Sequence, residues 1–258
     1  MAYKIRNKNW NYTPGQKKTH RISRTKIDYF GECPRCFYID QRHGIARPGM
    51  PSFTLNLAVD ALLKKEFDTY REKEEPHPLM KEFDIDAVPY QHKDLETWRE
   101  NFTGVTHFHE ATGFEIFGAV DDIWVNKEGE LMVVDYKATS KEEKPTLEGR
   151  WGEQYQRQMD VYQWLLRQNG FKVSDTGYFV YANGRKGEDE FDAELKFDMD
   201  VIAYEGNTDW IEERLLAIKE TLDSDEVPES GELCEHCPYR SAAGQLLLQK
   251  HKDGKVKK

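Results

Sequence analysis

The chain has 258 residues, of which 38% are hydrophobic and 33% are charged, and its formal net charge is -10. This length and the content of thirteen tyrosines, thirteen phenylalanines and six tryptophans indicate a globular chain with a sizeable core and exclude a disordered one. No apolar run reaches the roughly 18 residues that a membrane span requires, and the first ten residues lack an apolar signal core. We therefore predict a cytoplasmic protein that has no membrane partner.

The negative charge is unevenly distributed along the chain. Residues 1–22 contain basic side chains and no acid, and residues 246–258 are also mainly basic. Either end could attract a phosphate backbone, and Trp10 and Tyr12 could stack on bases; the alternative is that both ends only solubilise the chain. We expect a basic N-terminal arm over 1–22, one domain over 23–245 and a basic tail over 246–258.

Two helices are predicted in the first third of the chain. Ser23 is suited to cap a short helix over residues 24–30, because its hydroxyl can accept a backbone N–H of the first turn. Residues 52–72 carry apolar side chains at helical spacing and should form a longer helix. Its exposed face is expected to hold four charged side chains: Lys64, Lys65, Asp68 and Arg71.

The stretch 118–137 predicts two strands joined by a turn at residues 126–129. The strand over residues 114–117 could run into the first of these two strands as one long bent strand. Side chains alternate between the faces of a strand, so Asp135 and Lys137 should project from one face. Asp121, on the preceding strand, could join them there.

Two ionised carboxylates close together repel each other, and a divalent cation is the usual way to keep both ionised. Hard oxygen ligands with an open position suit Mg²⁺ or Mn²⁺. A nearby lysine can then orient a metal-bound water or stabilise the charge that develops on a phosphate, which suits metal-assisted hydrolysis of a phosphodiester. The alternative for Asp135 and Lys137 is an ordinary salt bridge at a strand end that has no catalytic role.

Four further elements are predicted after the hairpin: a helix over 151–169, strands over 176–181 and 190–197, and a helix over 208–222. On the first of these helices Tyr155, Gln158 and Tyr162 share one face, because they lie at positions i, i+3 and i+7. A polar stripe of this kind is common on surface helices, so its spacing alone assigns no function.

All four cysteines stand in two pairs, Cys33-x-x-Cys36 and Cys234-x-x-Cys237, near opposite ends of the chain. Two such pairs can form a four-thiolate site for zinc or for an iron–sulfur cluster. Disulfides are the alternative, and a reducing compartment disfavours them. A metal here would join distant segments and stabilise the fold by several kcal/mol.

Three motifs follow one another along the chain: Gly118-x-x-Asp121, Asp135-x-Lys137 at the end of an apolar strand, and Gln158-x-x-x-Tyr162 on a helix. In this order they resemble the RecB-like branch of the PD-(D/E)XK nucleases, which includes AddB-type and CRISPR-associated exonucleases. The segment 23–38, SRTKIDYFGECPRCFY, and the two cysteine pairs fit the same pattern, so the resemblance covers most of the chain. It implies an α/β fold with a restriction-endonuclease-like core, in which helices flank a central mixed sheet and the four-cysteine site joins the two ends.

The resemblance also implies a role for each motif residue. Asp121 and Asp135 would hold the catalytic Mg²⁺ or Mn²⁺, and Lys137 would assist the attacking water. Gln158 and Tyr162 would lie along the DNA.

Two positions depart from the family pattern. Many RecB-like nucleases have a metal-binding histidine where this chain has Asp60, which could replace it as an oxygen ligand or be a surface acid. The relatives bind a 4Fe–4S cluster through one N-terminal and three C-terminal cysteines. Here Ala243 stands near the third C-terminal position, and Cys36 could supply the missing ligand. The resemblance favours a 4Fe–4S cluster, and the symmetric pairs leave zinc as the alternative.

The function that we expect is that of a metal-dependent DNA nuclease, which prefers single strands and degrades them from an end. It would serve DNA repair, recombination or CRISPR-type processing, with a helicase or integrase as a possible protein partner. The alternative is an inactive nuclease-like module that binds nucleic acid, and Asp60 is the residue that favours it.

Overall fold

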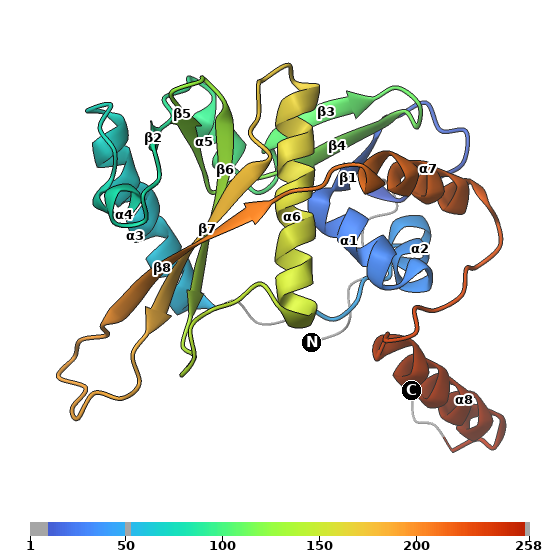
Figure 1. The fold of residues 1–258 in the computed structure, drawn as a ribbon. Coiled ribbons are helices and arrows are strands. Elements are labelled where there is room, and N and C mark those ends of the chain that lie inside the picture. The colour runs from blue at the N-terminus through green and yellow to red at the C-terminus, as the bar shows by residue number, and fades with distance from the viewer. Residues whose placement is uncertain (1–9, 50–52, 256–258) are drawn as a thin grey trace.

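The computed structural model describes residues 10–49 and 53–255 of the chain (Figure 1). These residues contain eight helices and eight strands, which are joined by turns and loops. In chain order they are β1 (His20–Ser23), α1 (Arg24–Glu32), α2 (Pro34–His43), α3 (Thr54–Arg71), α4 (Pro78–Glu82), β2 (Ala87–Pro89), α5 (Leu95–Arg99), β3 (Val105–His109), β4 (Phe114–Gly118), β5 (Asp122–Asn126), β6 (Leu131–Thr139), α6 (Gly149–Gln168), β7 (Thr176–Gly184), β8 (Phe197–Glu205), α7 (Trp210–Asp223) and α8 (His236–Lys252). None of these described helices combines the length and the apolar composition that crossing a lipid bilayer requires.

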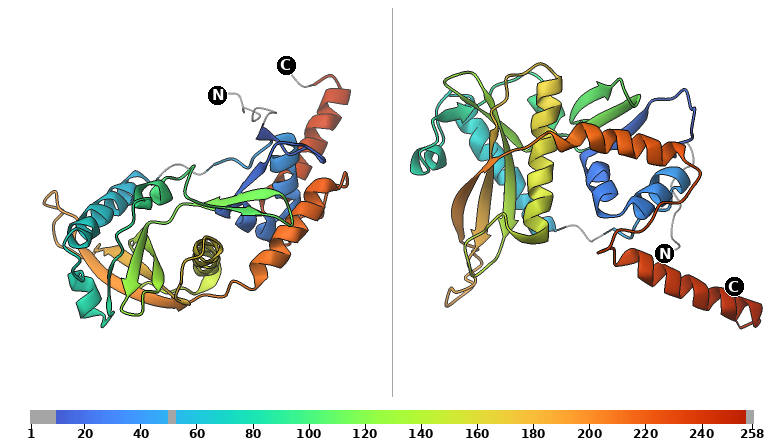
Figure 2. Two further views of the ribbon diagram at one scale, coloured as in Figure 1. Left: turned by 90° about the horizontal axis from the view of Figure 1, so that it is seen from above. Right: turned by 45° about the vertical axis from the view of Figure 1, so that its right-hand side comes forward.

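The strands form two sheets that curl around one helix. The larger sheet has the order β2-β5-β6-β7-β8, in which β6 and β7 are parallel and the other neighbours are antiparallel. The smaller sheet has the order β1-β4-β3, in which β1 runs parallel to β4. Parallel neighbours need a long crossover connection, and α6 provides it between β6 and β7. Figure 2 shows α6 end-on inside the curve of the strands, and the predicted α/β fold with a mixed sheet flanked by helices is confirmed.

The five-stranded sheet separates two hydrophobic cores. Val133 belongs to the core that contains the buried side chains of α6, whereas Val134 belongs to the core that contains those of α3. Burying a side chain of this size contributes about 1.5–3 kcal/mol, so the alternation fixes which face of β6 meets which helix. It also directs Asp135 toward α6 and Tyr136 toward α3, as strand geometry predicts.

A network of buried charges lies between α3, α5 and the sheet. Asp122, which has no exposed surface, accepts hydrogen bonds from Tyr136 Oη at 2.6 Å and from Arg99 Nη2 at 3.3 Å, and it also pairs with Arg71. Arg71 is only 4% exposed, so the expectation that it lies on an exposed helix face was wrong. Both arginines therefore reach into the fold to pair with the buried carboxylate of Asp122.

Replacing Arg71 by alanine is expected to lower the free energy of unfolding by about 3–5 kcal/mol, because breaking a buried ion pair leaves an uncompensated charge. Chemical denaturation of the variant beside the unmodified protein would measure the difference. Lys65→Ala is a matched control, since Lys65 is exposed on the same helix. A loss of under about 1 kcal/mol, as for an exposed pair, would mean that Arg99 alone compensates Asp122.

The predicted helices agree with α1, α3, α6 and α7, whose bounds differ from the expected ones by at most two residues. The predicted strand over 190–197 was wrong, because β7 continues to Gly184 and its partner β8 begins only at Phe197. Asp192 and Ala193 have φ values of 41° and 56°, a region that residues other than glycine rarely adopt, so the segment turns instead of extending. The sequence of β8, FDMDVIAYE, gives no clean alternation because most of its side chains are only half-buried.

The two basic ends are partly built into the fold. Tyr12 is 5% exposed and its hydroxyl donates to Asp223 Oδ1 at 2.6 Å, so the expectation that Tyr12 could stack on bases was wrong. Trp10 remains exposed, with the Lys18 ammonium 5.3 Å from its ring centroid. Strand β1 begins within the expected arm, and α8 runs across position 246, where the basic tail was expected to begin. Residues 1–9 and 256–258 lie outside the described residues.

Candidate active site and cysteine cluster

The predicted catalytic side chains meet at the open end of the hairpin formed by β5 and β6. Asp121 directly precedes β5, and Asp135 and Lys137 lie on one face of β6. A cleft of about 280 Å³ opens beside them, between α3 and the first half of α6, and Asp60, Asp121 and Lys137 are among the residues that line it. Asp135 lies beneath the cleft and is only 1% exposed. The hairpin therefore gathers the side chains that the sequence motif had grouped.

A break between β4 and β5 places Asp121 in this site. The sequence left open one long bent strand here, whereas the structure has two strands in different sheets, separated at residues 119–121. Gly118 ends β4 against the ring of Tyr162, where an added Cβ would lie 2.7 Å from a ring carbon. Asp121 Oδ2 then accepts the backbone N–H of Tyr136 at 3.1 Å, which fixes the break against β6.

The carboxylate of Asp135 is held by several partners. Its Oδ1 accepts a hydrogen bond from Gln158 Nε2 at 2.7 Å, and its Oδ2 pairs with the Lys137 ammonium. Gln158 Nε2 also donates to Tyr162 Oη at 3.1 Å, while Lys137 Nζ lies 4.3 Å from the ring centroid of Tyr155. Gln158 and Tyr162 are 9% and 4% exposed, so both side chains face the carboxylate from α6 and not an open surface.

Burial and mutual charge set the protonation of this pair. Burial raises the pKa of Asp135 to about 6, with Lys137 lowering it and Asp121 raising it. Burial alone would lower the pKa of Lys137, but the carboxylates of Asp135 and Asp121 raise it above its ordinary value. Lys137 is therefore an ammonium, and the Asp135 carboxyl beside it releases its proton at a higher pH than an ordinary aspartate does.

Lys64 is a second cation in the site, and the sequence analysis placed it wrongly on the exposed face of its helix. Its Nζ lies 2.9 Å from Asp60 Oδ2 and 3.0 Å from Asp121 Oδ1, so one ammonium bridges two carboxylates. Burial would lower the pKa of Lys64, but Asp121 and Asp60 raise it. Burial and the charge of Asp121 raise the pKa of Asp60. The signal in the sequence was the i, i+4 spacing of Asp60 and Lys64 on α3.

Arg24 is a third cation near the carboxylates, and no sequence motif pointed to it. It is the first residue of α1, its guanidinium lies 6.0 Å from the ring centroid of Tyr162, and its charge lowers the pKa of Asp135. Its buried Nε has no hydrogen-bond partner among the described residues. An acceptor entering the site, such as a phosphate oxygen, could take up this donor.

The donor set of the cleft fits a hard divalent cation. Asp60, Asp121 and Asp135 offer carboxylate oxygens, which Mg²⁺ and Mn²⁺ prefer. The three acids do not form a closed cage, because in the described part of the chain only the cysteines bring three or more potential ligand atoms within 4.8 Å of one another. Lys64 stands between two of the acids, so a cation bound by both must displace this ammonium.

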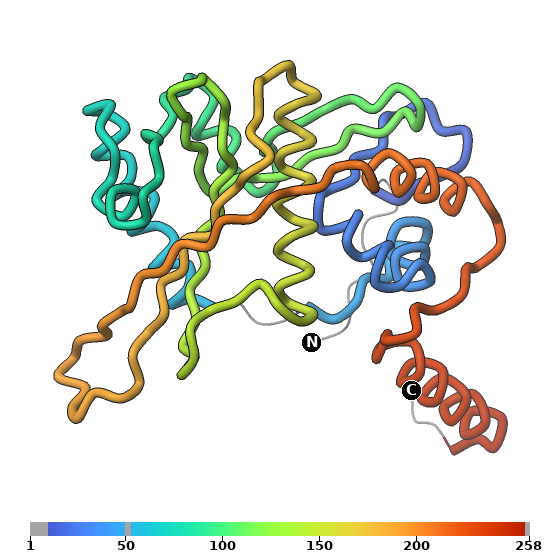
Figure 3. The backbone as a smooth tube through the Cα atoms, viewed as in Figure 1, coloured from blue at the N-terminus to red at the C-terminus, as the bar shows by residue number. Residues whose placement is uncertain are grey.

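The four cysteines cluster at the corner between α1 and α2. Cys33 and Cys36 lie at that corner. The segment 224–235 leads from α7 to α8 (Figure 3), and Cys234 near its end and Cys237 just beyond it join the same cluster. All four side chains are buried, and their closest Sγ atoms are 3.5 Å apart. A disulfide bond is about 2.05 Å long, so these cysteines are free thiols, and the predicted pairing of the two ends is confirmed.

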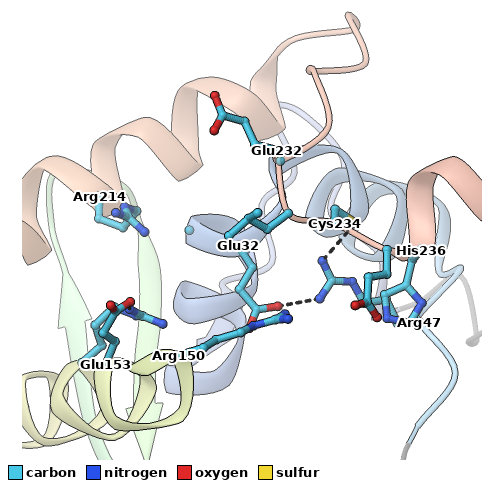
Figure 4. Close-up of a pocket in the computed structure, with 13 residues that line it drawn as sticks. Glu32, Arg47, Arg150, Glu153, Arg214, Glu232, Cys234 and His236 are labelled. Atoms are coloured by element: carbon cyan, nitrogen blue, oxygen red, sulfur yellow. Dashed lines mark hydrogen bonds and ion pairs between the residues drawn. The ribbon is translucent and has the colours of Figure 1, made fainter. Parts of the chain in front are cut away.

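A cavity of about 500 Å³ lies beside the cysteine cluster, among α1, α6 and α7 (Figure 4). Its charged lining consists of four arginines and four glutamates: Arg47, Arg150, Arg157, Arg214, Glu32, Glu153, Glu232 and Glu235. Arg47 pairs with Glu32 at 2.6 Å and donates to Cys234 Sγ at 3.7 Å. The opposite charges balance, so this cavity lacks the excess of positive charge that would attract an anion.

Comparison with known proteins places these observations in a family context. A model of the PD-(D/E)XK nuclease superfamily matches residues 21–242, a range that includes every predicted active-site residue and all four cysteines. The solved structure titled "Crystal structure of SSO0001" is similar over 83% of this chain and 81% of that chain, with 16% sequence identity and a TM-score of 0.41. A comparison with curated proteins found no match.

Proposed function

This chain belongs to the PD-(D/E)XK nuclease superfamily, and we propose that it is a Mg²⁺- or Mn²⁺-dependent deoxyribonuclease that hydrolyses phosphodiester bonds. It would prefer single-stranded DNA, degrade it from an end and serve DNA repair, recombination or CRISPR-type processing, as the resemblance to the RecB-like branch implies. The observation that carries the proposal is the meeting of Asp121, Asp135 and Lys137 beside one cleft.

The residues of the cleft divide the chemistry between them. Asp121 and Asp135 would hold the metal ion, with Asp60 as a third oxygen ligand. When bound, the ion would polarise the scissile phosphate and lower the pKa of the attacking water. Gln158 fixes the orientation of the Asp135 carboxylate through its 2.7 Å hydrogen bond. Lys137 presents an ammonium to the cleft, where it can orient that water and stabilise negative charge on the phosphate.

The DNA strand would pass over the first half of α6. The resemblance assigns Gln158 and Tyr162 to the strand, and their contacts with Asp135 support a role in positioning that carboxylate as well. We propose Arg24 as an additional phosphate contact, because its guanidinium lies beside Tyr162 and its Nε has no partner within the described residues.

Replacing Lys64 by alanine is expected to raise the affinity for Mn²⁺ about tenfold, because two partly exposed ion pairs worth up to about 1 kcal/mol each would no longer compete with the ion. Calorimetric titration of Mn²⁺ into the variant and the unmodified protein would measure the change. Lys65→Ala, one position further along α3 and exposed, is the control. Unchanged or weaker binding would mean that Lys64 does not compete with the ion and remains part of the site when the metal is bound.

Digestion of end-labelled linear and closed circular single-stranded DNA tests the proposed activity, with Mn²⁺ and with EDTA in parallel. Loss of the linear substrate alone, and only with the metal, is the expected result. Cutting of the circle would refute the requirement for an end. Equal digestion of an RNA of the same sequence would refute the preference for DNA.

The second candidate function is a nuclease-like module that binds nucleic acid without cutting it. Lys64 favours this candidate, because its ammonium already pairs with Asp60 and Asp121, two of the three acids that would hold a metal ion. Tight binding of single-stranded DNA with no cleavage of either substrate would support it. Under either candidate, we propose a helicase- or integrase-type protein as the partner.

A further inference from the structure

The four sulfur atoms of the cysteine cluster lie very close together. Cys36 Sγ is 3.5 Å from Cys237 Sγ and 3.6 Å from Cys234 Sγ, and Cys33 Sγ is 3.7 Å from Cys237 Sγ. All four sulfurs lie within 4.8 Å of one another. The cluster is therefore compact although no bond joins its members.

These spacings distinguish the two kinds of metal centre that four thiolates hold in proteins. A single zinc ion binds four sulfurs at about 2.3 Å in a tetrahedron, which places the sulfurs about 3.8 Å apart. In a 4Fe–4S cluster each thiolate binds a different iron atom at a corner of a cube, so the sulfurs lie roughly 6 Å apart. The distances of 3.5 to 3.7 Å match the single ion.

The surrounding backbone resists separation of the two cysteine pairs. Gly231 packs so closely against the helix corner that an added Cβ would lie 2.0 Å from Glu32 O, and its N–H donates to Cys33 Sγ at 3.3 Å. Cys33 also ends α1 and caps α2, so both helices fix its position. A 4Fe–4S cluster would need the sulfurs to move apart by about 2 Å against these contacts.

Cys36 takes part in the cluster as closely as the other three cysteines. The RecB-like pattern instead uses a third C-terminal cysteine, near the position where this chain has Ala243. Ala243 lies six residues beyond Cys237 on α8, or about 9 Å along the helix axis. The two C-x-x-C pairs that remain have the ligand spacing typical of structural zinc sites.

Two arginine side chains contact the sulfurs of the cluster. One zinc ion with four thiolates carries two negative charges, and two guanidinium groups are available to balance them. Arg47 Nη2 donates to Cys234 Sγ at 3.7 Å, as Figure 4 shows, and Arg240 Nη2 donates to Cys237 Sγ at the same distance. Outer partners of this kind orient metal ligands and tune their affinity.

We propose that Cys33, Cys36, Cys234 and Cys237 hold one zinc ion in a closed tetrahedral site, in place of the 4Fe–4S cluster that the family resemblance favours. With four protein ligands the ion has no open coordination position, so it is structural and redox-inert. It joins the α1–α2 corner to the start of α8 and is separate from the divalent ion of the cleft.

Metal analysis of the full chain tests this assignment, after anaerobic purification from cells supplied with both iron and zinc. The expected result is one zinc ion per chain and no visible iron–sulfur absorption. Iron and acid-labile sulfide at about four each per chain would overturn the proposal. A protein that holds neither metal and cannot be loaded with zinc would overturn it equally.

X-ray absorption at the zinc edge gives a second readout on the unmodified protein, so the test does not depend on a variant that folds. A single shell of four sulfurs at about 2.3 Å is expected, and nitrogen or oxygen ligands in that shell would contradict the four-cysteine site. Cys36→Ser is expected to abolish stoichiometric zinc binding, with Ala243→Ser as the control that retains it. Zinc retained in Cys36→Ser would overturn the assignment of Cys36.

Discussion

Lys137→Ala is expected to lower kcat for DNA cleavage about 100- to 1,000-fold, the cost of removing one donor that stabilises charge in a transition state. Lys137 pairs with Asp135 and presents its ammonium to the cleft. Alanine at this position leaves the cleft without that charge. Substrate binding should change little, because the proposed phosphate contact at Arg24 is untouched. Single-turnover cleavage of a labelled strand, with Mn²⁺ at saturation, measures the loss.

Loss of the ammonium also affects Asp135, and the design of the experiment must separate the two effects. Lys137 lowers the pKa of the Asp135 carboxyl, so the variant will hold that carboxyl protonated to a higher pH. Cleavage should therefore be compared at alkaline pH as well, where Asp135 is ionised in both proteins. Lys127→Ala is the matched control, because Lys127 is 75% exposed at the opposite end of the same hairpin. Turnover in Lys137→Ala that approaches the control would refute the role of Lys137.

The strand residues of the site could be predicted from sequence because a strand has only two faces. Once residues 131–136 are read as a buried strand, alternation fixes Asp135 and Lys137 on one side and Tyr136 on the other. The structure agrees, since Asp135 meets Gln158 of α6 whereas Tyr136 meets Asp122 and packs on Phe67 of α3. The pairing of the cysteines was equally accessible, because C-x-x-C spacing directs both sulfurs to one point.

The helix residues of the site were harder to predict. Charged side chains on α3 suggested one solvent-facing stripe, but an amphipathic pattern does not distinguish a face toward water from a face toward buried acids. Lys64 turns to Asp121 as well as to its own helix neighbour Asp60, and Arg71 turns to Asp122. The sequence pattern of α3 did not show this, because Asp121 and Asp122 come from a hairpin some 50 positions away. Arg24 was missed for the same reason, since α1 meets the site only through the tertiary fold.

Loss of the proposed zinc ion from the cysteine cluster is expected to lower the free energy of unfolding by about 4 kcal/mol or more, because a ligand held at a thousand times its Kd stabilises the native state by that amount. For a chain of this size the melting temperature should fall roughly 10 °C. Cys33→Ser is the most informative variant, since Cys33 has no exposed surface and lies at the junction of α1 and α2. Calorimetry in buffer without Mg²⁺ or Mn²⁺ measures the change without contribution from the cleft.

A chelator provides the control for that experiment, because it removes the metal without changing the sequence. Chelation should bring the unmodified protein down to the melting temperature of Cys33→Ser and should leave the variant unchanged. An equal fall in both proteins would mean that the chelator acts elsewhere. Unchanged melting in Cys33→Ser would mean that α1, α2 and α7 hold this region through packing alone, in which case the metal would add little to the closure of the fold. Among the described residues the four cysteines form a cluster separate from the hydrophobic core of α6 and its sheet, so the stability of that core should respond mainly through the closure.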